Sequence, residues 1–373
     1  MSLDITPRYL WNKYITQALA TLTASDAIST APVSFLFSPD PNKKWNSYFN
    51  FTIVTGFNDT IPIGSTEVVL TAGNYTGTEL AAHVLVRLEA VVGGGGWSCT
   101  FNVAGPNKFR INNSSPFVFK WTTTANPGRV AGYDLGFNAS VDSASSASHI
   151  SVNSVYQSRH YVQVDLGSSK SLQCAVVYKH NVASTGSVTV LADDTPNWTT
   201  PSLSQALSGT YTGNYPILLA FFGTVSKRYV RFVFNDCQNS QASNQAGIIY
   251  AGPYSQMTRG FKPGSQETAR SLSQFEMSDQ GSVYQNSKGA GGKQFQLNYS
   301  KIKGTDKTEI DAMWEAVGGM GGMLFLAKDP QNNPATDTHY GYFSQEPVYT
   351  WAVADGTPAL RYDVSLQFQR HIA

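Results

Sequence analysis

The chain has 373 residues, with 26 basic and 25 acidic side chains, and only 14% of its residues are charged. This length allows two or three domains with sizeable cores, and the balanced charge argues against binding to nucleic acid through a basic surface. The 20 phenylalanines, 19 tyrosines and 32 glycines favour short strands joined by turns, so the composition predicts a mainly β protein.

The N-terminal segment MSLDITPRYLWNKY has no basic start followed by an apolar run, so it does not resemble a signal peptide. The longest apolar runs, such as residues 215–223, are too short to span a membrane. We therefore expect a protein made in a cytoplasm and not inserted into a membrane. Residues 9–19 fit a helix and a strand equally.

Two segments carry helical patterns. Residues 76–96 offer Thr78 as N-cap, apolar residues at 80, 84, 88 and 91, and a stop of four glycines. Residues 304–322 offer Thr305 as N-cap, early acidic residues, an apolar face at 310, 313, 314 and 317, and terminal glycines. We expect one helix in each segment.

The other regular segments alternate apolar and polar residues, which is the period of a half-buried strand. Turn-forming sequences such as STGS, DDTPN and KDPQNNP separate them. No block recurs at a fixed period, so we do not expect a solenoid or a propeller. The predicted strands lie within residues 161–167, 174–182, 186–193, 227–236, 293–302 and 361–372.

One group of strands resembles a known family. The sequence YVQVDLGSSKSLQCAVVYKHNVASTGSVTVLADD, followed by SKRYVRFVFND, resembles the discoidin, or coagulation-factor C-type, β-sandwich. The resemblance implies that loops at one end of the sandwich face a ligand. Alternation in RYVRFVF places Val230, Phe232 and Phe234 on one face, and Arg231 on the other, where it can pair or reach solvent.

The opening of the same family pattern, rich in Thr, Ala and Ser before a Pro and a Trp, matches residues 20–47. We therefore predict a discontinuous sandwich of residues 1–48 and 156–253, with residues 49–155 inserted at a loop as a small α+β module. Trp45 belongs to the sandwich, and Phe49 and Phe51 begin the insert. The chain is expected to leave between Ser47 and Phe51 and to return near residues 156–160.

The insert and the C-terminal third carry two weaker resemblances. AGNYTGTELA before the helix and LGF after the strands resemble a small β-rich module of virion and tail proteins. Residues 254–373 resemble the strand, helix, strand and long hairpin of tailed-phage distal-tail and minor tail proteins, through KDP, YGYF and the alternating strand at the end. We expect a C-terminal tail-type β domain with one helix.

The cysteines and histidines form no recognisable metal site. Cys99, Cys174 and Cys237 are odd in number and widely spaced, so they make neither a zinc cluster nor a disulfide framework. Buried free thiols are favoured over a bridge between Cys174 and Cys237. Among the histidines at 83, 149, 160, 180, 339 and 371, His180 matches a position of the discoidin-like pattern, although a structural role in a loop is favoured.

The acidic residues give no catalytic pair. Asp193 and Asp194 lie in LADDTPNW, where a turn is favoured over a calcium site. Glu309, Asp311 and Asp329 are further candidates, but the sequence does not place two carboxylates across a cleft. No nucleophile elbow or phosphate-binding loop occurs. We therefore predict no enzyme, no cofactor, and no catalytic or metal-binding residue.

Aromatic residues in or near turns are the last candidates, because flat rings could stack on sugars. Packing in the core or in an interface is the favoured role for most of them, and the ligand-binding residues stay unassigned. The candidates are Tyr75, Trp121, Tyr133, Trp198, Tyr211 and Tyr215.

Together these features predict a structural component of a bacteriophage tail, at the distal tail, tail tip or baseplate. Its partners would be other tail proteins and copies of itself in a ring or trimer, within a virion assembled in the host cytoplasm. Such a protein can carry carbohydrate-binding-like modules, so the alternative is a receptor-binding tail protein whose sandwich loops or insert recognise host-surface glycans. A secreted carbohydrate-active enzyme is disfavoured by the missing acid pair.

Overall fold

The computed structural model describes residues 6–11, 14–15, 20–25, 27, 30–47, 50–196, 198, 200–213, 215–239, 243–262, 264–270, 274–277, 283–286, 292–319, 323–352 and 360–371. The chain forms two compact units. The central unit is Tyr14–Ala251, and the terminal unit joins Met1–Lys13 to Gly252–Ala373. The fold is mainly β, as predicted, with two α-helices among the described residues.

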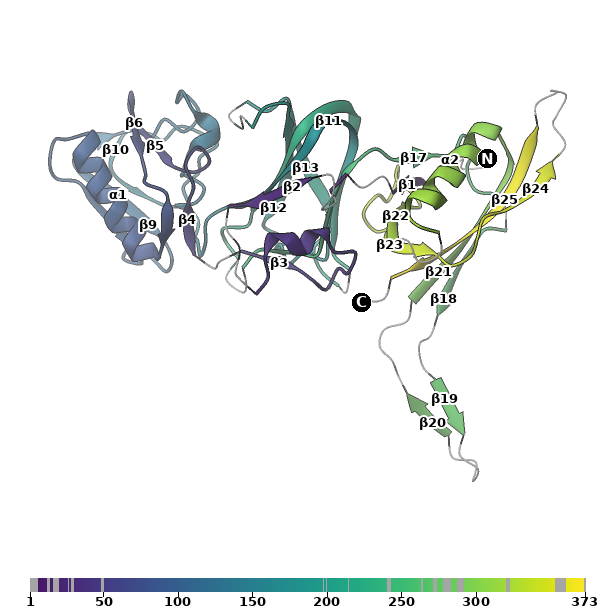
Figure 1. The fold of residues 1–373 in the computed structure, drawn as a ribbon. Coiled ribbons are helices and arrows are strands. Elements are labelled where there is room, and N and C mark those ends of the chain that lie inside the picture. Colours follow the sequence, from purple (N-terminus) through teal and green to yellow (C-terminus); the bar gives the residue numbers. More distant parts are fainter. Residues whose placement is uncertain are drawn as a thin grey trace. The chain divides into compact units, whose positions relative to one another are not determined.

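A β-sandwich forms one part of the central unit (Figure 1). Its strands pair in the order β12-β13-β14-β11-β16, with β2 also on β11. The first half of β11 pairs with the second half of β14, and the register shifts between Asp165 and Lys170. Such irregularities bend strands, so two long strands can curve around one core. The strands are β2 (Thr21–Ala24), β11 (His160–Tyr178), β12 (Ser187–Asp193), β13 (Leu203–Thr210), β14 (Ile217–Asn235) and β16 (Ile248–Gly252).

The segment before the insert contributes to the sandwich core. It holds the 3₁₀ helix η1 (Val33–Phe37) and β3 (Trp45–Asn46), which pairs with β15 (Gln245–Ala246). Trp45 is fully buried, with its ring centroid 5.2 Å from that of Phe234. Val162, Val164, Val188, Val190, Val230 and Phe232 belong to the same hydrophobic cluster.

The second part of the central unit follows residue 50 and has its own hydrophobic cluster. Helix α1 contacts β8 and buries Leu80, Val84 and Leu88, as its pattern predicts, whereas Val91 is exposed. The sheet order is β10-β9-β8, and β4–β7 and β5–β6 form separate pairs. The elements are β4 (Phe51–Ile53), β5 (Thr60–Ile63), β6 (Thr66–Val69), β7 (Gly73–Tyr75), α1 (Gly77–Val91), β8 (Ser98–Phe101), β9 (Phe109–Phe117), η2 (Pro127–Arg129) and β10 (Ser146–Ile150).

The N-cap of helix α1 lies two residues before the predicted one. Thr76, not Thr78, is the N-cap, because its hydroxyl accepts a hydrogen bond from the Glu79 backbone N–H. The Glu79 carboxylate in turn accepts one from the Thr76 backbone N–H at 2.8 Å. This reciprocal capping box satisfies two backbone donors that a helix start leaves unpaired.

The two ends of the inserted segment lie side by side. Ser47 bonds to Asn244 of the sandwich, through its backbone N–H at 2.9 Å and its hydroxyl at 3.0 Å. Shortly after, the carbonyl of Asn50 accepts a hydrogen bond from the Ser158 N–H, and the Ser158 hydroxyl accepts one from the Thr52 N–H. The chain therefore leaves and returns at adjacent points; Phe49 lies outside the described residues, and the predicted domain boundaries stay a prediction.

Arg231 differs from its expected role. Its side chain is only 6% exposed and has no carboxylate partner in the described part of the chain. The guanidinium donates to the Gln163 side chain and lies 4.0 Å from the Tyr161 ring centroid and 4.4 Å from that of Trp198. The two ring faces stabilise the cation. Trp198 covers the guanidinium on the side where the sequence predicts access to solvent, so Arg231 is buried instead.

The terminal unit is an eight-stranded sheet. Its order is β17-β1-β22-β23-β25-β21-β18, with β24 paired to β25, while β19 and β20 form a separate pair beyond the ends of β18 and β21 (Figure 1). The strands are β1 (Arg8–Leu10), β17 (Ser255–Gln256), β18 (Gln266–Arg270), β19 (Gln274–Met277), β20 (Val283–Asn286), β21 (Gly292–Ile302), β22 (Met323–Ala327), β23 (Thr338–Phe343), β24 (Val348–Ala352) and β25 (Arg361–Arg370).

The N-terminal strand lies outside the sandwich that the sequence predicts. That sandwich includes residue 1 onward, but β1 pairs antiparallel with β22 and β17 of the terminal unit. Tyr9 is fully buried there, and its hydroxyl is 2.5 Å from that of Tyr299. The three-residue strand completes a distant sheet, so its partners are fixed by packing that the local pattern does not encode.

Helix α2 (Gly304–Ala316) covers the terminal sheet and buries Ile310 and Met313. Its N-cap is Lys303, and the predicted cap Thr305 lies inside the first turn. The Asp306 carboxylate accepts hydrogen bonds from the backbone N–H of Lys303 and of Thr258, each at 3.0 Å. Neither described helix is long and apolar enough to cross a membrane.

Candidate functional site

The three cysteines are buried, and no disulfide joins them, as favoured from the sequence. Burial raises the pKa of Cys99 to about 12 and that of Cys237 well above its usual value. A thiol is nucleophilic only as the thiolate. These side chains therefore act as small apolar groups at neutral pH.

His180 is held as a structural residue of a loop. Its Nδ1 accepts a hydrogen bond from the Val182 backbone N–H at 3.1 Å, so Nε2 carries the proton and donates to the Thr210 carbonyl at 3.1 Å. The ring is 3% exposed, and this burial lowers its pKa to about 4. Because both ring nitrogens of this neutral imidazole are engaged in hydrogen bonds, neither is available to a metal or a substrate.

His180 is expected to make the stability of the central unit depend on pH. The folded state holds the ring neutral, whereas the unfolded chain takes up a proton near pH 6.5, so the free energy of unfolding falls as the pH drops from about 6.5 to about 4. Denaturant titrations at several pH values measure this free energy. In a His180→Gln variant, its slope against pH between about 4 and 6.5 should be smaller by up to about 1.4 kcal/mol per pH unit. Equal slopes in the two proteins would contradict this; His83→Gln, at a half-buried ring, is the control and should change the slope less.

Asp193 and Asp194 form a turn in which both carboxylates are engaged. Asp193 accepts from the backbone N–H of Asp194 at 2.7 Å, and from the N–H and hydroxyl of Ser202 at 2.9 and 3.0 Å. Asp194 pairs with Lys227 at 2.9 Å. These bonds match the favoured turn.

The remaining acidic candidates also have local partners. Glu309 accepts from the Ser255 hydroxyl, Asp311 accepts from the Tyr349 hydroxyl at 2.8 Å, and Asp329 accepts from the backbone N–H of Asn332 at 3.2 Å. No group of three or more His, Cys, Asp or Glu side chains that could hold a metal occurs among the described residues.

Most of the aromatic candidates pack against other side chains. Trp121 lies in the core of the insert, Tyr75 stacks on His83 with centroids 5.1 Å apart, and Trp198 covers Arg231. Tyr211 is partly buried against the sandwich core, and Tyr215 is also partly buried. Tyr133 differs, because its side chain is 43% exposed.

The largest exposed aromatic was not among the predicted candidates. Trp351 lies on β24 and is 76% exposed, and Val348 on the same strand is 52% exposed. Leu360, just before β25, is also exposed. Among the described strands, β24 pairs only with β25, so its other backbone edge has no ladder partner.

The inner side of β24 is anchored to helix α2. The Tyr349 hydroxyl donates to Asp311 at 2.8 Å, and Lys307 lies 4.7 Å from the Tyr349 ring centroid. Burial, together with this carboxylate, raises the pKa of Tyr349 above its usual value, so the hydroxyl stays a donor at neutral pH. The strand is thereby fixed while Trp351 is presented outward, beside the Tyr362 ring at 5.8 Å.

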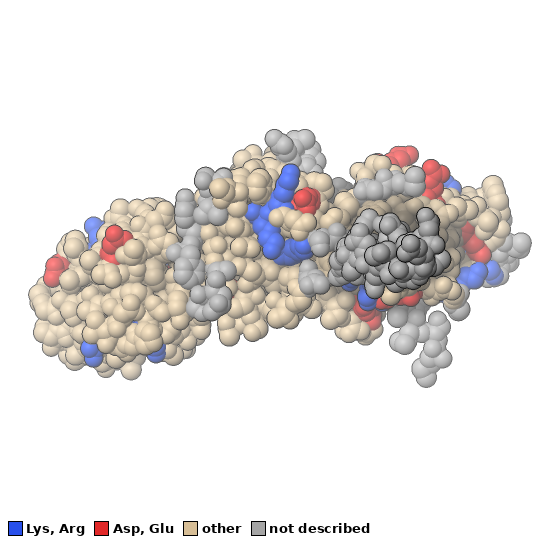
Figure 2. All heavy atoms as spheres, turned by 90° about the horizontal axis from the view of Figure 1, so that it is seen from below, with Lys and Arg blue, Asp and Glu red and all other residues tan. Residues whose placement is uncertain are grey.

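A groove of about 410 Å³ adjoins the edge strand. Val348 and Thr350 of β24 line it together with Asp363 and Ser365 of β25. Figure 2 shows one face of the molecule, on which uncharged residues cover most of the described surface. Val348, Trp351 and Leu360 are exposed at or beside a strand edge that is open in the described sheet, so the β24 edge, defined here as Val348–Ala352 with Leu360, is a candidate protein interface.

No protein-family model and no curated protein matches the chain. Three solved structures are similar in part. Module 1 of the chitosan-binding modules from a Paenibacillus sp. IK-5 chitosanase/glucanase is 12% identical, covers 65% of this chain and 98% of its own, and has a TM-score of 0.29. Module 2, in complex with chitotriose, is 15% identical over 26% of this chain and 78% of its own, with a TM-score of 0.19.

The third is a truncated AlyQ with CBM32 and alginate lyase domains. It is 13% identical, covers 58% of this chain and 84% of its own, and has a TM-score of 0.18. The matched structures are therefore carbohydrate-binding modules or contain one. At these TM-scores the similarity assigns no function to this chain.

Proposed function

We propose that the chain is a non-enzymatic structural subunit of a bacteriophage tail, at the distal tail, tail tip or baseplate, and that it acts by oligomeric assembly within the virion. The observation that carries the proposal is the β24 edge, where Trp351 is 76% exposed beside an edge without a ladder partner in the described sheet. Its partners are copies of the same chain and neighbouring tail proteins.

Two physical arguments support an interface at this edge. An open strand edge is a template for pairing with another chain, and soluble proteins usually protect it with charge, proline or a covering segment. The β24 sequence VYTWA has no charged residue and no proline. Tryptophan is also enriched among the residues that contribute most to binding energy, so burial of Trp351 would stabilise a complex.

The order of elements supports the tail assignment. The terminal unit runs β21, α2, β22, β23, β24 and β25 along the chain. This order agrees with the strand, helix, strand and long hairpin on which the sequence resemblance to distal-tail and minor tail proteins rests. The alternative function is recognition of host-surface glycans. The β24 edge gives no support to it, because an open strand edge pairs with another polypeptide chain.

Replacing Trp351 with serine is expected to convert the oligomer to monomers. Loss of one central aromatic contact typically weakens an interface by about 2 kcal/mol or more, which is about a thirtyfold change in Kd. Light scattering on the purified full chain at several concentrations measures the mass, and electron microscopy gives the symmetry.

The matched control is Val103→Ser, because Val103 is also exposed and lies in the insert. It should leave the mass unchanged. A wild-type chain that stays monomeric at all concentrations, or a Trp351→Ser variant with the same mass as the wild type, would overturn assembly through this edge.

A further inference from the structure

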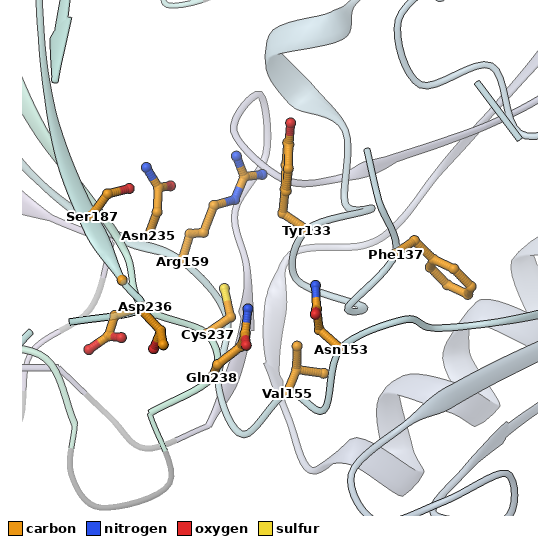
Figure 3. Close-up of a pocket in the computed structure, with 12 residues that line it drawn as sticks. Tyr133, Phe137, Asn153, Val155, Arg159, Ser187, Asn235, Asp236, Cys237 and Gln238 are labelled. Atoms are coloured by element: carbon orange, nitrogen blue, oxygen red, sulfur yellow. The ribbon is translucent and has the colours of Figure 1, made fainter. Parts of the chain in front are cut away.

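Two exposed aromatic side chains differ in what covers them. Tyr133, which is 43% exposed, lines a cavity of about 430 Å³ in the central unit, where the Arg159 guanidinium lies 5.4 Å from its ring centroid (Figure 3). Trp351 is 76% exposed, and in the part of the chain that the structure describes its one ring contact is with Tyr362, at 5.8 Å. Trp351 therefore leaves the larger surface for a partner chain to bury.

The strand that carries Trp351 has two different faces, because successive side chains of a strand point to opposite sides of the sheet. Tyr349 and Trp351 share the face that carries α2, since the Tyr349 hydroxyl donates to Asp311 of that helix at 2.8 Å. The other three residues of β24 share the opposite face, where Val348 and Thr350 line the groove of about 410 Å³. The strand thus presents two aromatic rings to one side and three smaller side chains to the other.

The β24 sequence is chemically alike when read in either direction. In VYTWA the two end residues are aliphatic, the second and fourth are aromatic, and Thr350 is central. If this strand pairs antiparallel with a copy of itself about its centre, threonine lies opposite threonine, and each tyrosine lies opposite a tryptophan. Directly opposite residues have Cβ atoms roughly 4.5–5.5 Å apart, and aromatic pairs and threonine pairs at these positions stabilise a sheet.

We propose that β24 pairs antiparallel with β24 of a second copy of the chain, about a two-fold axis at Thr350. The pairing rests on the proposed assembly through the β24 edge, and it names the partner and the register. Pro347 precedes the strand and has no N–H to lengthen the ladder, so matching Val348–Ala352 with its copy uses the whole strand. Trp351 then lies beside Tyr349 of the second copy.

Two properties of the strand suit it to pairing with itself. A two-fold axis brings the central residues close to their own copies, so a charged residue there would meet a like charge, and β24 contains none. Tyr349 is also held in place, by its bond to Asp311 and by Lys307, whose ammonium lies 4.7 Å from the ring centroid. A ring that is already fixed loses little conformational freedom when Trp351 of the second copy packs beside it.

The other margins of the terminal sheet are protected. At one margin, β18 contains Glu267 and Arg270, and Glu267 is paired with Lys328 at 2.8 Å. At the other margin, β17 has two residues. Charge and short length are the usual protections of an open strand edge. Among the described edges of this sheet, β24 lacks both, so it is the edge best suited to accept another β24.

Disulfide trapping in the full chain tests the pair. Directly opposite residues of an antiparallel pair have Cα atoms roughly 4.5–5.5 Å apart, which is within the range of a disulfide. With glutathione disulfide as oxidant, Thr350→Cys should form a covalent dimer about tenfold faster or more than the exposed control Val103→Cys, because pairing raises the effective concentration of the two thiols. The three native cysteines are buried and do not take part.

Two further variants test the register. In the proposed pair, residue 348 of one copy lies opposite residue 352 of the other. A mixture of Val348→Cys and Ala352→Cys chains should therefore crosslink as fast as Thr350→Cys. Either variant alone should crosslink no faster than Val103→Cys, because its two thiols are displaced by four residues, about 13 Å along the strand.

The pairing and the proposed assembly are overturned by different results. A wild-type chain that stays monomeric would overturn both. An oligomer in which Thr350→Cys crosslinks no faster than Val103→Cys, such as a trimer, would overturn the two-fold pairing and leave assembly in place. Equal crosslinking of the mixed chains and of Val348→Cys alone would overturn the register.

Discussion

Replacing Asp134 with alanine is expected to lower the free energy of unfolding of the central unit by about 3–5 kcal/mol. The Asp134 carboxylate is fully buried, accepts from the Arg159 backbone N–H at 2.6 Å and pairs with its guanidinium at 2.9 Å. Removal of the acid leaves Arg159, whose side chain is only 11% exposed, without its counter-charge. An uncompensated buried charge is far more costly than a lost surface contact.

Hydrogen exchange of the β11 and β14 amides, followed through a urea titration, measures this loss in the central unit. Asp194→Ala is the matched control, because Asp194 pairs with Lys227 at the same 2.9 Å but is 52% exposed, and solvent screening leaves such exposed pairs with little effect on stability. Equal losses in the two variants would contradict the prediction.

A double variant separates charge from packing. In Asp134→Leu with Arg159→Met, both charged groups are replaced by apolar ones of similar size, so no buried charge is left unpaired. Replacing a whole buried pair is often close to neutral. We therefore expect the double variant to recover most of the stability that Asp134→Ala loses, and a loss as large as that of the single variant would show that the cost lies in packing or in the backbone hydrogen bond.

Local patterns predicted the longest strands and both helices. The alternating segments lie within or overlap β11, β12, β14, β21 and β25, with the two segments at 161–167 and 174–182 joined in the single strand β11, and both helices formed where predicted. The α1 cap was missed because Thr76, two residues before Thr78, is an equally plausible cap residue. The α2 cap was missed because Lys303 is not a usual cap residue, and the hydrogen bond at this helix start comes instead from its backbone N–H to Asp306. The place of β1 was missed because its partner β22 lies near the other end of the chain.

The candidate sites were harder to predict for a different reason. Tyr133 was identified from its turn and is 43% exposed, whereas most of the other aromatic candidates pack against neighbouring side chains. Trp351 was missed because alternation in VYTWA assigns it to a half-buried face. Whether a side chain is covered depends on what packs against the strand, and near Trp351 the described structure leaves most of the ring exposed.

Replacing Trp45 with alanine is expected to lower the stability of the sandwich by about 3–5 kcal/mol. The indole is fully buried and packs against Phe234 of β14, so its removal leaves a large cavity in the sandwich core. Hydrogen exchange of the amides of β11, β12 and β14 through a denaturant titration measures the loss. Val103→Ala, at an exposed valine to which no interface is assigned, is the control and should cost less than about 0.5 kcal/mol.

The same experiment tests the discontinuous sandwich. Trp45 precedes the insert and Phe234 follows it, whereas the insert has a separate hydrophobic cluster that includes Leu88 of α1 and Phe109 of β9. If the sandwich is one domain interrupted by another, Trp45→Ala should speed exchange in β11 and β14 much more than in α1 and β9. Equal loss of protection in all four elements would mean that residues 14–251 unfold as one cooperative unit, and that the insert has no stability of its own.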